Sequence, residues 1–285
     1  MFRKEKNMKP LKLGLIGYPL SHSKSPELHQ GFLAKCGLNG EYNLYPIPPD
    51  DADALKALLN RVRTGEIHGL NVTIPHKQNV IPLLDELSDT AQTIGAVNTI
   101  VFRDGKLIGE NTDAPGFAKD LQILIPIRPR ANALVLGSGG AARAVVYALL
   151  NAGWDVTLAT RHADIEQAHI LIEDYATRNT QYAAKLSNIE LKASTLSPLM
   201  PALSLIVNTT PVGMSSHLQG SPYHKDLPFP PNAALYDLIY NPSKTQLMQD
   251  AEKVGLPVRG GIGMLESQAM LSFEIWTGRK IGDKK

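Results

Sequence analysis

Two serines stand one residue apart in the stretch HSKSP, residues 22–26, directly after a short apolar run. Ser25 precedes Pro26, and this order predicts a helix with Ser25 as its N-cap and proline at the first helical position. One hydroxyl is enough for that cap, so Ser23 has no structural task in this interpretation. Free amides and the helix dipole favour negative charge at a helix N-terminus, so the pair could instead bind a carboxylate or phosphate.

Three further polar side chains are placed where they could move a proton or bind a ligand. The stretch NVTIPHK ends a predicted strand and puts Lys77 near the first turn of a helix, where a cation is electrostatically disfavoured. Lys77 is therefore a candidate acid, base or anion ligand. Asp113 in ENTDAPGF precedes a predicted helix, and Asn98 in GAVNT begins a predicted strand. The structural alternatives are a solvated surface lysine, a helix N-cap and a turn residue.

A glycine-rich turn lies between a predicted strand and a predicted helix in residues 132–153, NALVLGSGGAARAVVYALLNAG. Gly137, Gly139 and Ala142 have the spacing of a dinucleotide-binding fingerprint. In that motif the first glycine allows a tight turn, the second lets backbone amides approach a pyrophosphate, and a small third residue lets the helix pack on the strand. The sequence therefore predicts a dinucleotide site, with a plain turn as the alternative.

The end of the following strand, in VTLATRHAD, discriminates between the two nicotinamide cofactors. An NAD site carries an acid there for the ribose hydroxyls, whereas this chain has Thr160 and Arg161. A hydroxyl and a guanidinium suit a 2′-phosphate, so we predict NADP. The alternative is a solvated arginine in a loop.

The elements that must position these residues follow an alternating pattern. Helical spacing of apolar residues predicts helices over 25–37 and 50–65, and shorter apolar runs predict strands over 12–17, 41–47 and 69–75. This alternation is typical of βαβ units and a parallel sheet.

A β-hairpin over 96–111, with its turn at Asp104 and Gly105, interrupts this alternation, and a domain boundary is predicted near Asn111–Pro115. Beyond it we predict a helix over 115–125, a short loop from 128, strands over 132–137, 154–160, 204–210 and 233–240 with helices between them, and a long final helix over 263–278.

The composition excludes several classes of protein. The 285 residues carry 29 basic and 27 acidic side chains without a basic stripe, which argues against nucleic-acid and membrane-surface partners. The single cysteine, Cys36, excludes an internal disulfide and a cysteine-based metal cluster. The basic N-terminal stretch is followed by an interrupted apolar segment, a poor signal peptide, and no apolar run is long enough for a transmembrane helix. We expect a soluble cytoplasmic protein with a small-molecule partner.

Eight stretches in order give the chain a resemblance to the shikimate dehydrogenase family over nearly its whole length. They are GYPLSHSKSPELHQ, GLNVTIPHK, IGAVNT, GENTDAPGF, VLGSGGAARA, NTTPVGM, YDLIYNPSKTQLM and GGIGMLESQAMLSFEIWTG. The resemblance implies reversible, NADP-linked reduction of 3-dehydroshikimate to shikimate in aromatic (chorismate) biosynthesis. It also implies an α/β fold with two domains: a substrate domain with a mostly parallel sheet at 1–113, completed by 262–285, and a Rossmann-type NADP-binding domain at 114–261.

The resemblance also implies roles for individual residues. Lys77 and Asp113 match the catalytic dyad. Residues matching the substrate site are Ser23, Ser25, Thr73, Asn98, Tyr240 and Gln268. Residues matching the cofactor site are Gly137, Gly139, Gly140, Ala141, Thr160, Arg161, Asn208, Thr209, Gly261 and Met264. No metal is implied.

The chain departs from the family pattern at a few positions. Ser138 stands where alanine is commoner, Thr160 where asparagine often precedes the arginine, and Glu266 with Ser267 where small or apolar residues are usual. The alternatives are a quinate or dual quinate/shikimate dehydrogenase that uses NAD, a metabolite-binding regulator without the chemistry, and a Rossmann reductase of another small carbonyl. A monomer and a homodimer are both compatible with the sequence.

Overall fold

The computed structural model describes residues 10–125, 131–215, 220–223 and 226–282, and the chain divides into two compact units. The first unit comprises Met1–Gln92, Ala96–Thr112 and Ala269–Lys285, and the second comprises Thr93–Gly95 and Asp113–Gln268. Most of the basic N-terminal stretch and part of the loop predicted from residue 128 lie outside the described residues.

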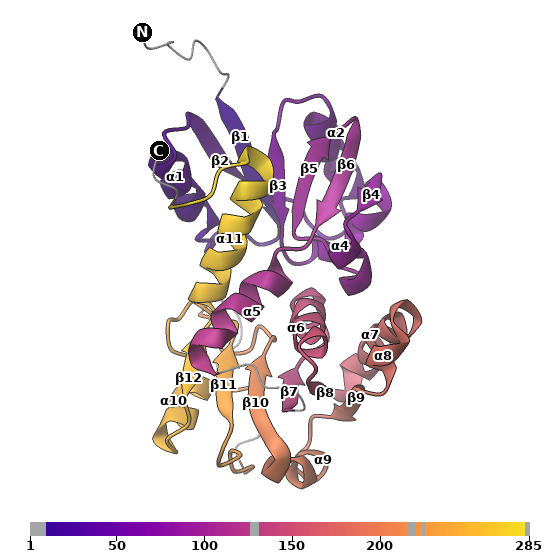
Figure 1. Ribbon diagram of the computed structural model, residues 1–285, viewed down its shortest axis with the longest axis vertical. Helices are drawn as coiled ribbons and strands as arrows, with labels where there is room; N and C mark the ends of the chain where they lie inside the picture. Colours follow the sequence, from indigo (N-terminus) through magenta and orange to yellow (C-terminus); the bar gives the residue numbers. More distant parts are fainter. Residues whose placement is uncertain (1–9, 126–130, 216–219, 224–225, 283–285) are drawn as a thin grey trace. The chain divides into compact units, whose positions relative to one another are not determined.

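The first unit is built on a six-stranded sheet in the order β2-β1-β3-β5-β6-β4 (Figure 1). Its strands are β1 (Leu11–Gly17), β2 (Gly40–Pro46), β3 (Gly69–Val72), β4 (Glu86–Leu87), β5 (Thr99–Arg103) and β6 (Lys106–Glu110). Only β5 runs against its neighbours, so the predicted mostly parallel sheet is confirmed. The predicted hairpin is confirmed too, because Asp104 (φ 53°) and Gly105 (φ 79°) both adopt the positive φ of a tight two-residue turn.

The helices of the first unit connect these strands. They are α1 (Ser25–Lys35), α2 (Ala52–Arg63), the short α3 (His76–Asn79) and α4 (Asp89–Ile94), with a 3₁₀ turn at Ile81–Leu83. The α2 helix buries Leu55, Leu58, Leu59 and Val62, at the spacing of one helical face, and these side chains join a core with residues of the sheet.

The second unit contains a six-stranded, fully parallel sheet in the order β12-β11-β10-β7-β8-β9. Its strands are β7 (Asn132–Leu136), β8 (Asp155–Thr160), β9 (Leu186–Glu190), β10 (Leu203–Asn208), β11 (Ala234–Asp237) and β12 (Val258–Gly260). The chain order across this sheet is that of the doubly wound dinucleotide-binding fold, and the predicted Rossmann-type unit is confirmed.

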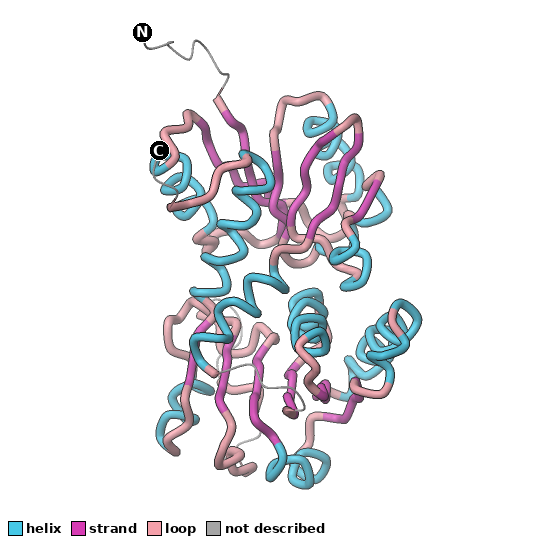
Figure 2. Tube along the Cα trace, in the orientation of Figure 1, coloured by secondary structure: helices cyan, strands magenta, loops and turns pink. Residues whose placement is uncertain are grey.

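Helices surround the strands of the second unit (Figure 2). They are α5 (Asp113–Leu124), α6 (Gly140–Asn151), α7 (Ile165–Arg178), α8 (Thr180–Ala183), α9 (Ala193–Leu196), α10 (Gln246–Lys253) and α11 (Ile262–Thr277), with 3₁₀ turns at His162–Asp164 and Ser197–Ala202. The final helix, α11, returns to the first unit as predicted, but from Ala269 onward instead of from residue 262, since residues 262–268 belong to the second unit.

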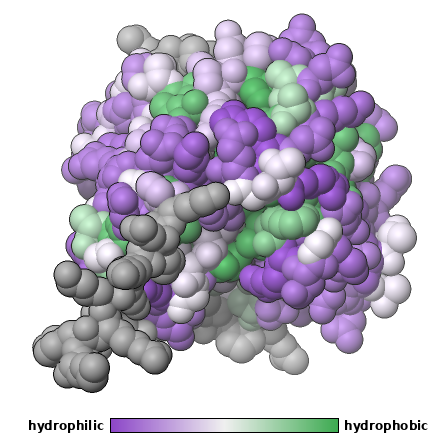
Figure 3. Space-filling model, turned by 90° about the horizontal axis from the view of Figure 1, so that it is seen from above, coloured by the Kyte–Doolittle hydropathy of each residue, from purple (hydrophilic) through white to green (hydrophobic). Residues whose placement is uncertain are grey.

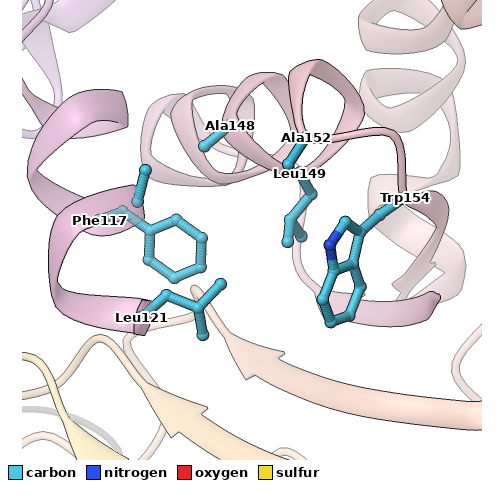
Figure 4. A pocket seen from close by; sticks show the side chains of 7 residues that line it. Phe117, Leu121, Ala148, Leu149, Ala152 and Trp154 are labelled. Carbon is cyan, nitrogen blue, oxygen red and sulfur yellow. The ribbon is translucent and has the colours of Figure 1, made fainter. Parts of the chain in front are cut away.

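Apolar packing fixes α5 against α6 in the second unit. Phe117 and Leu121 of α5 face Leu149 of α6 and the indole of Trp154 across a small apolar pocket (Figure 4). All four side chains are fully buried, and burying one aromatic or leucine side chain contributes roughly 1.5–3 kcal/mol. This packing determines the direction of α5, whose first residue is Asp113.

The surface carries many polar residues. In Figure 3 hydrophilic residues predominate over the visible face, with hydrophobic patches between them. None of the helices in the described ranges is long and apolar enough to cross a membrane.

A histidine is buried in the aromatic core of the first unit. The ring of His29 stacks on Tyr42, with centroids 4.3 Å apart and planes 2° from parallel, and packs near Phe273 and Trp276. Neither ring nitrogen has a hydrogen-bond partner among the described residues. Burial therefore lowers the pKa of His29 from 6.5 to about 3.

This burial predicts an acid-sensitive contribution to stability. Folded His29 stays neutral where unfolded His29 takes up a proton, so its stabilising effect is complete above pH 6.5 and is lost as the pH falls toward 3. The His29→Phe protein has no titratable ring at this position, so this pH-dependent contribution to its unfolding free energy is absent. We expect the free energy of unfolding of the wild type to fall by about 2 kcal/mol more than that of the variant between pH 7 and pH 5.

Urea denaturation at pH 7, 6 and 5 measures this difference. The exposed His22 provides the control, because His22→Gln is expected to keep the wild-type pH dependence. Parallel pH profiles for wild type and His29→Phe would show that His29 does not resist protonation.

Candidate active site

At the start of α1, Ser23 and not Ser25 supplies the hydroxyl that accepts a backbone hydrogen bond. The α1 helix begins at Ser25 itself, and Lys24 at its N-cap position makes no side-chain capping bond. The Ser25 amide instead donates to Ser23 Oγ over 3.2 Å. The prediction that Ser25 is the N-cap is therefore wrong, because Lys24 already has helical backbone angles (φ −86°, ψ −4°) and places Ser25 inside the first turn. Ser25 is buried.

Lys77 lies on the short α3 helix that follows β3, and two contacts fix this segment. The ring Nε2 of its neighbour His76 lies 2.7 Å from the carbonyl oxygen of Ile47. The carbonyl oxygen of Lys77 accepts from the amide of Val97 at 2.8 Å. Thr73 precedes α3, and its amide donates to the carbonyl of Ile16 at 2.8 Å. Thr73, Lys77 and the segment before Asn98 are therefore positioned together at the carboxyl ends of β1 and β3.

A buried layer of uncharged polar side chains surrounds Asn98. Its Oδ1 accepts from the amide of Thr112 at 2.7 Å, and its Nδ2 donates to Thr112 Oγ1 at 2.9 Å. Asn71 Nδ2 donates to the carbonyl of Asn98 at 3.1 Å and to Ser272 Oγ at 2.9 Å. Thr99 Oγ1 and Ser272 Oγ lie 2.7 Å apart. All five residues are buried.

Sequence reasoning missed four members of this layer, Asn71, Thr99, Thr112 and Ser272. A signal existed for Asn71, because it is the one polar side chain in the fully buried strand GLNV. The layer holds Thr112, and Asp113 follows as the first residue of α5. Asp113 is itself buried and is assigned to the second unit, whereas Lys77 belongs to the first.

The glycine turn at the end of β7 has the geometry that its sequence predicts. Gly137 has φ +103°, a conformation that side chains rarely adopt, and a Cβ there would lie 2.9 Å from Thr209 Oγ1. Gly139 is the N-cap of α6, and a Cβ there would have no heavy atom within 4 Å. Ala142 is fully buried. The turn thus leaves open space in front of the α6 N-terminus, where Gly140 and Ala141 begin the helix.

The end of β8 presents an exposed cation next to a buried hydroxyl. The Thr160 side chain is buried and donates to Asn188 Oδ1 at 3.3 Å. Arg161 is exposed, and its Nε donates to Asp164 Oδ2 at 2.7 Å. This exposed ion pair is weak, so it leaves the guanidinium accessible.

The remaining candidates in the second unit lie in loops and at the start of α11. Asn208 is buried at the end of β10, and Thr209 Oγ1 donates to the carbonyl of Leu136 beside the glycine turn. Tyr240 is half-buried in the segment after β11. A Cβ at Gly261 would lie only 2.0 Å from the carbonyl oxygen of Leu238, so only glycine fits there.

The α11 helix crosses α5 closely through glycine. A Cβ at Gly116 would lie 2.9 Å from the backbone nitrogen of Gln268, and one at Gly263 would lie 2.0 Å from Asp120 Oδ1. Asp120 also accepts two hydrogen bonds from Arg259, both of 2.6 Å. These contacts fix Gln268 relative to the rest of the second unit. Met264 and Ser267 are buried nearby in α11, whereas Glu266 is exposed.

No group of three or more His, Cys, Asp or Glu side chains in the described part of the chain could hold a metal ion. The glycine turn, the open α6 N-terminus and the parallel sheet together place the chain among the Rossmann-type dinucleotide-binding proteins.

Comparison with known proteins identifies the family. The sequence model of the shikimate dehydrogenase substrate binding domain matches residues 15–100, and that of the shikimate 5'-dehydrogenase C-terminal domain matches residues 261–282. Shikimate dehydrogenase (NADP(+)) of Methanococcus maripaludis is 37% identical over 94% of this chain and 92% of its own length. The chain belongs to the shikimate dehydrogenase family.

Solved structures agree with this assignment. Shikimate 5-dehydrogenase of Thermus thermophilus, in complex with NADP(H) and shikimate, has 37% identity, a TM-score of 0.80 and 95% coverage of both chains. Quinate dehydrogenase of Corynebacterium glutamicum, in complex with NAD, has 29% identity, a TM-score of 0.83 and 95% coverage of both chains. The fold is therefore shared by proteins that differ in substrate and cofactor.

The geometry at the start of α1 generates a prediction for Ser23. Removing the Ser23 hydroxyl leaves the Ser25 amide without its acceptor, so Ser23→Ala is expected to lower the free energy of unfolding by about 0.5–1 kcal/mol. Asp51→Ala is the matched control, because it also removes a side-chain acceptor at the start of a helix. Asp51 Oδ1 caps α2 by accepting from the amide of Ala54 at 2.9 Å. Urea denaturation compares the variants, and an unchanged unfolding free energy for Ser23→Ala would show that Ser23 does not hold the helix start.

Proposed function

We propose that the chain is a cytoplasmic enzyme that catalyses the reversible, NADP-linked reduction of 3-dehydroshikimate to shikimate. The observation that carries the proposal is its match, over more than nine-tenths of the chain, to a relative named for this NADP-dependent activity. Of the binding and catalytic residues implied by the family motifs, Thr160 is the one that departs from the family pattern. The metabolite-binding regulator is disfavoured because both members of the dyad, Lys77 and Asp113, are present.

The residues of the glycine turn fit a dinucleotide. Two observations support this fit: the open space over Gly139 and the positive φ of Gly137. Together they let backbone amides approach a pyrophosphate. We propose that Gly137, Gly139, Gly140 and Ala141 hold the pyrophosphate and that the exposed guanidinium of Arg161 pairs with the 2′-phosphate. The loop residues Asn208 and Thr209, with Gly261 and Met264, are proposed to line the nicotinamide half of the cofactor site.

In this reaction the protein must position the substrate and the cofactor and supply one proton. When bound, NADPH supplies the hydride. Negative charge then develops on the C3 carbonyl oxygen, and we propose that the ammonium of Lys77 stabilises this charge and donates the proton. Asp113 is proposed as the second member of the dyad, hydrogen-bonded to the substrate hydroxyl next to the reacting carbon. Ser23 and Ser25 would bind the carboxylate, with Thr73, Asn98, Tyr240 and Gln268 as the other proposed substrate contacts.

An absorbance assay at the NADPH band tests the proposal. Shikimate and quinate are each oxidised with NADP and with NAD in a two-by-two design, and shikimate with NADP is expected to give the highest kcat/KM. Higher kcat/KM for quinate with NAD would favour the quinate-type alternative, which the shared fold of a quinate dehydrogenase makes a specific rival. Absence of turnover in all four combinations would contradict the proposal.

The proposed role of Lys77 predicts a loss of turnover without a loss of binding. Because Lys77 acts on charge that develops in the transition state, Lys77→Met is expected to lower kcat by about 10²- to 10⁴-fold. Steady-state kinetics and shikimate titration separate the two effects. Lys56→Met, at an exposed position of α2, is the control and is expected to retain wild-type kcat. A folded Lys77→Met protein with more than about a tenth of wild-type kcat would refute the role.

The proposed 2′-phosphate contact predicts an asymmetric effect of Arg161. A charge-assisted hydrogen bond contributes about 1.5–3 kcal/mol, so Arg161→Ala is expected to lower kcat/KM for NADP by at least about tenfold. The value for NAD should stay nearly constant, since NAD has no 2′-phosphate. The exposed Arg103 of the first unit provides the control substitution to alanine. Equal losses with both cofactors would exclude the 2′-phosphate contact.

A further inference from the structure

One fully buried carboxylate in the second unit holds three separate segments of the chain. Asp237 ends β11, and its Oδ1 accepts from Asn208 Nδ2 at 2.9 Å and from the amide of Ile239 at 3.1 Å. Its Oδ2 accepts from Thr245 Oγ1 at 2.7 Å. All three donors are uncharged, so the ionised form is stabilised by hydrogen bonds from the end of β10, the turn after β11 and the start of α10.

The first segment is the turn that follows β10. The Asn208 amide has a defined orientation, because its Nδ2 faces a carboxylate while its Oδ1 accepts from the amide of Thr210 at 2.9 Å and from Thr210 Oγ1 at 2.8 Å. Thr209 lies within this turn and contacts the carbonyl of Leu136, next to the glycine turn. Asp237 thus fixes the conformation of the turn that contains the proposed cofactor residues Asn208 and Thr209.

The second segment runs from β11 to α10 and contains Tyr240. The Asp237 carboxylate binds its beginning at the amide of Ile239 and its end at the hydroxyl of Thr245. Thr245 is also the N-cap of α10, where its Oγ1 accepts from the amide of Met248 at 3.2 Å. The carbonyl of Ile239 in turn accepts from the amide of Gly261 at 3.1 Å, so this segment also fixes the start of the α11 region.

We propose that Asp237 is a positioning residue that holds the turn at 208–210 and the segment at 238–245 in the conformation that binds both cofactor and substrate. This inference rests on the proposed function, in which Asn208 and Thr209 contact NADP and Tyr240 contacts shikimate. Burial raises the pKa of Asp237, and the hydrogen bonds from Thr245, Ile239 and Asn208 oppose this rise because they stabilise the ionised carboxylate.

Exchanging the two side chains of the Asn208–Asp237 pair tests the contact directly. Asn208→Asp alone places two carboxylates at hydrogen-bond distance, and we expect it to raise the Kd for NADP⁺ by at least about tenfold. In the double variant Asn208→Asp/Asp237→Asn an amide again faces a carboxylate. Its Kd, measured by calorimetry without substrate, is expected to recover part of that loss, because the amide at position 237 restores the contact with position 208 but cannot also accept from the amide of Ile239. A double variant that binds NADP⁺ no more tightly than Asn208→Asp would overturn the inference.

Substitutions at Thr245 separate positioning from stability. Thr245→Val removes both the hydrogen bond to Asp237 and the α10 cap, whereas Thr245→Ser keeps the hydroxyl. We expect Thr245→Val to raise both the KM for shikimate and the Kd for NADP⁺ by about threefold or more. Both constants of Thr245→Ser are expected to stay near the wild-type values. Asp51→Ala, which removes the cap of α2, is the control for general destabilisation and should leave both constants unchanged.

The result that would contradict positioning is a Thr245→Val protein with a lowered Tm but wild-type KM and Kd. Failure of the proposed function has a different signature. A wild-type protein that binds NADP⁺ but does not oxidise shikimate would refute the function, whereas the series of NADP⁺ Kd values would still decide the role of Asp237.

Discussion

The chain conformation just before α5 depends on the hydrogen bond from the Thr112 amide to Asn98 Oδ1, 2.7 Å long and buried. An unsatisfied buried polar group costs about 1–3 kcal/mol, so this bond defines one arrangement of residues 111–113 against its competitors. Asn71 and Ser272 complete the layer around Asn98 from β3 and α11. Lys77 is connected to the same region through its carbonyl and the amide of Val97. Buried polar groups therefore position the segments that carry Lys77 and Asp113, the two proposed catalytic residues.

The second unit applies the same physics at the carboxyl ends of its parallel strands. A parallel sheet gathers the loops that follow its strands at one edge, where ligands bind in this fold. Here the turn after β7 needs glycine for its backbone angles, and the loops after β10 and β11 share the Asp237 carboxylate. Packing of Phe117 and Leu121 sets the direction of α5, whereas hydrogen bonds set its first residue. Apolar burial supplies most of the stability, and the buried polar contacts select one geometry for the loops.

The regular elements could be predicted because their signals are local. Helical spacing identified α2, the alternation of strands and helices identified the Rossmann unit, and Asp104 with Gly105 identified the hairpin turn. The two-residue β4 and the three-residue β12 escaped prediction because so short a run has no periodicity. The start of α1 was misplaced by one residue, since the backbone angles of Lys24 are not encoded by the serine and proline that follow.

The supporting contacts of the site could not be predicted because they join distant parts of the chain. Asn71 and Ser272 are separated by 201 positions, and Asn208 and Asp237 by 29, so no local pattern relates them. The contact of the Thr160 hydroxyl with Asn188 could not be predicted either, because Asn188 comes from the neighbouring strand β9. Family motifs identify which residues are retained, and the structure adds what holds them.

Amide hydrogen exchange at Thr112, resolved by residue, tests most directly the claim that a buried polar layer positions the start of α5. The Thr112 amide is expected to exchange as slowly as those of the core strands β1 and β3, because its hydrogen bond to Asn98 opens only when the first unit unfolds. Exchange of the Thr112 amide as fast as that of an exposed turn such as Asp104–Gly105 would show that the buried layer does not hold this segment.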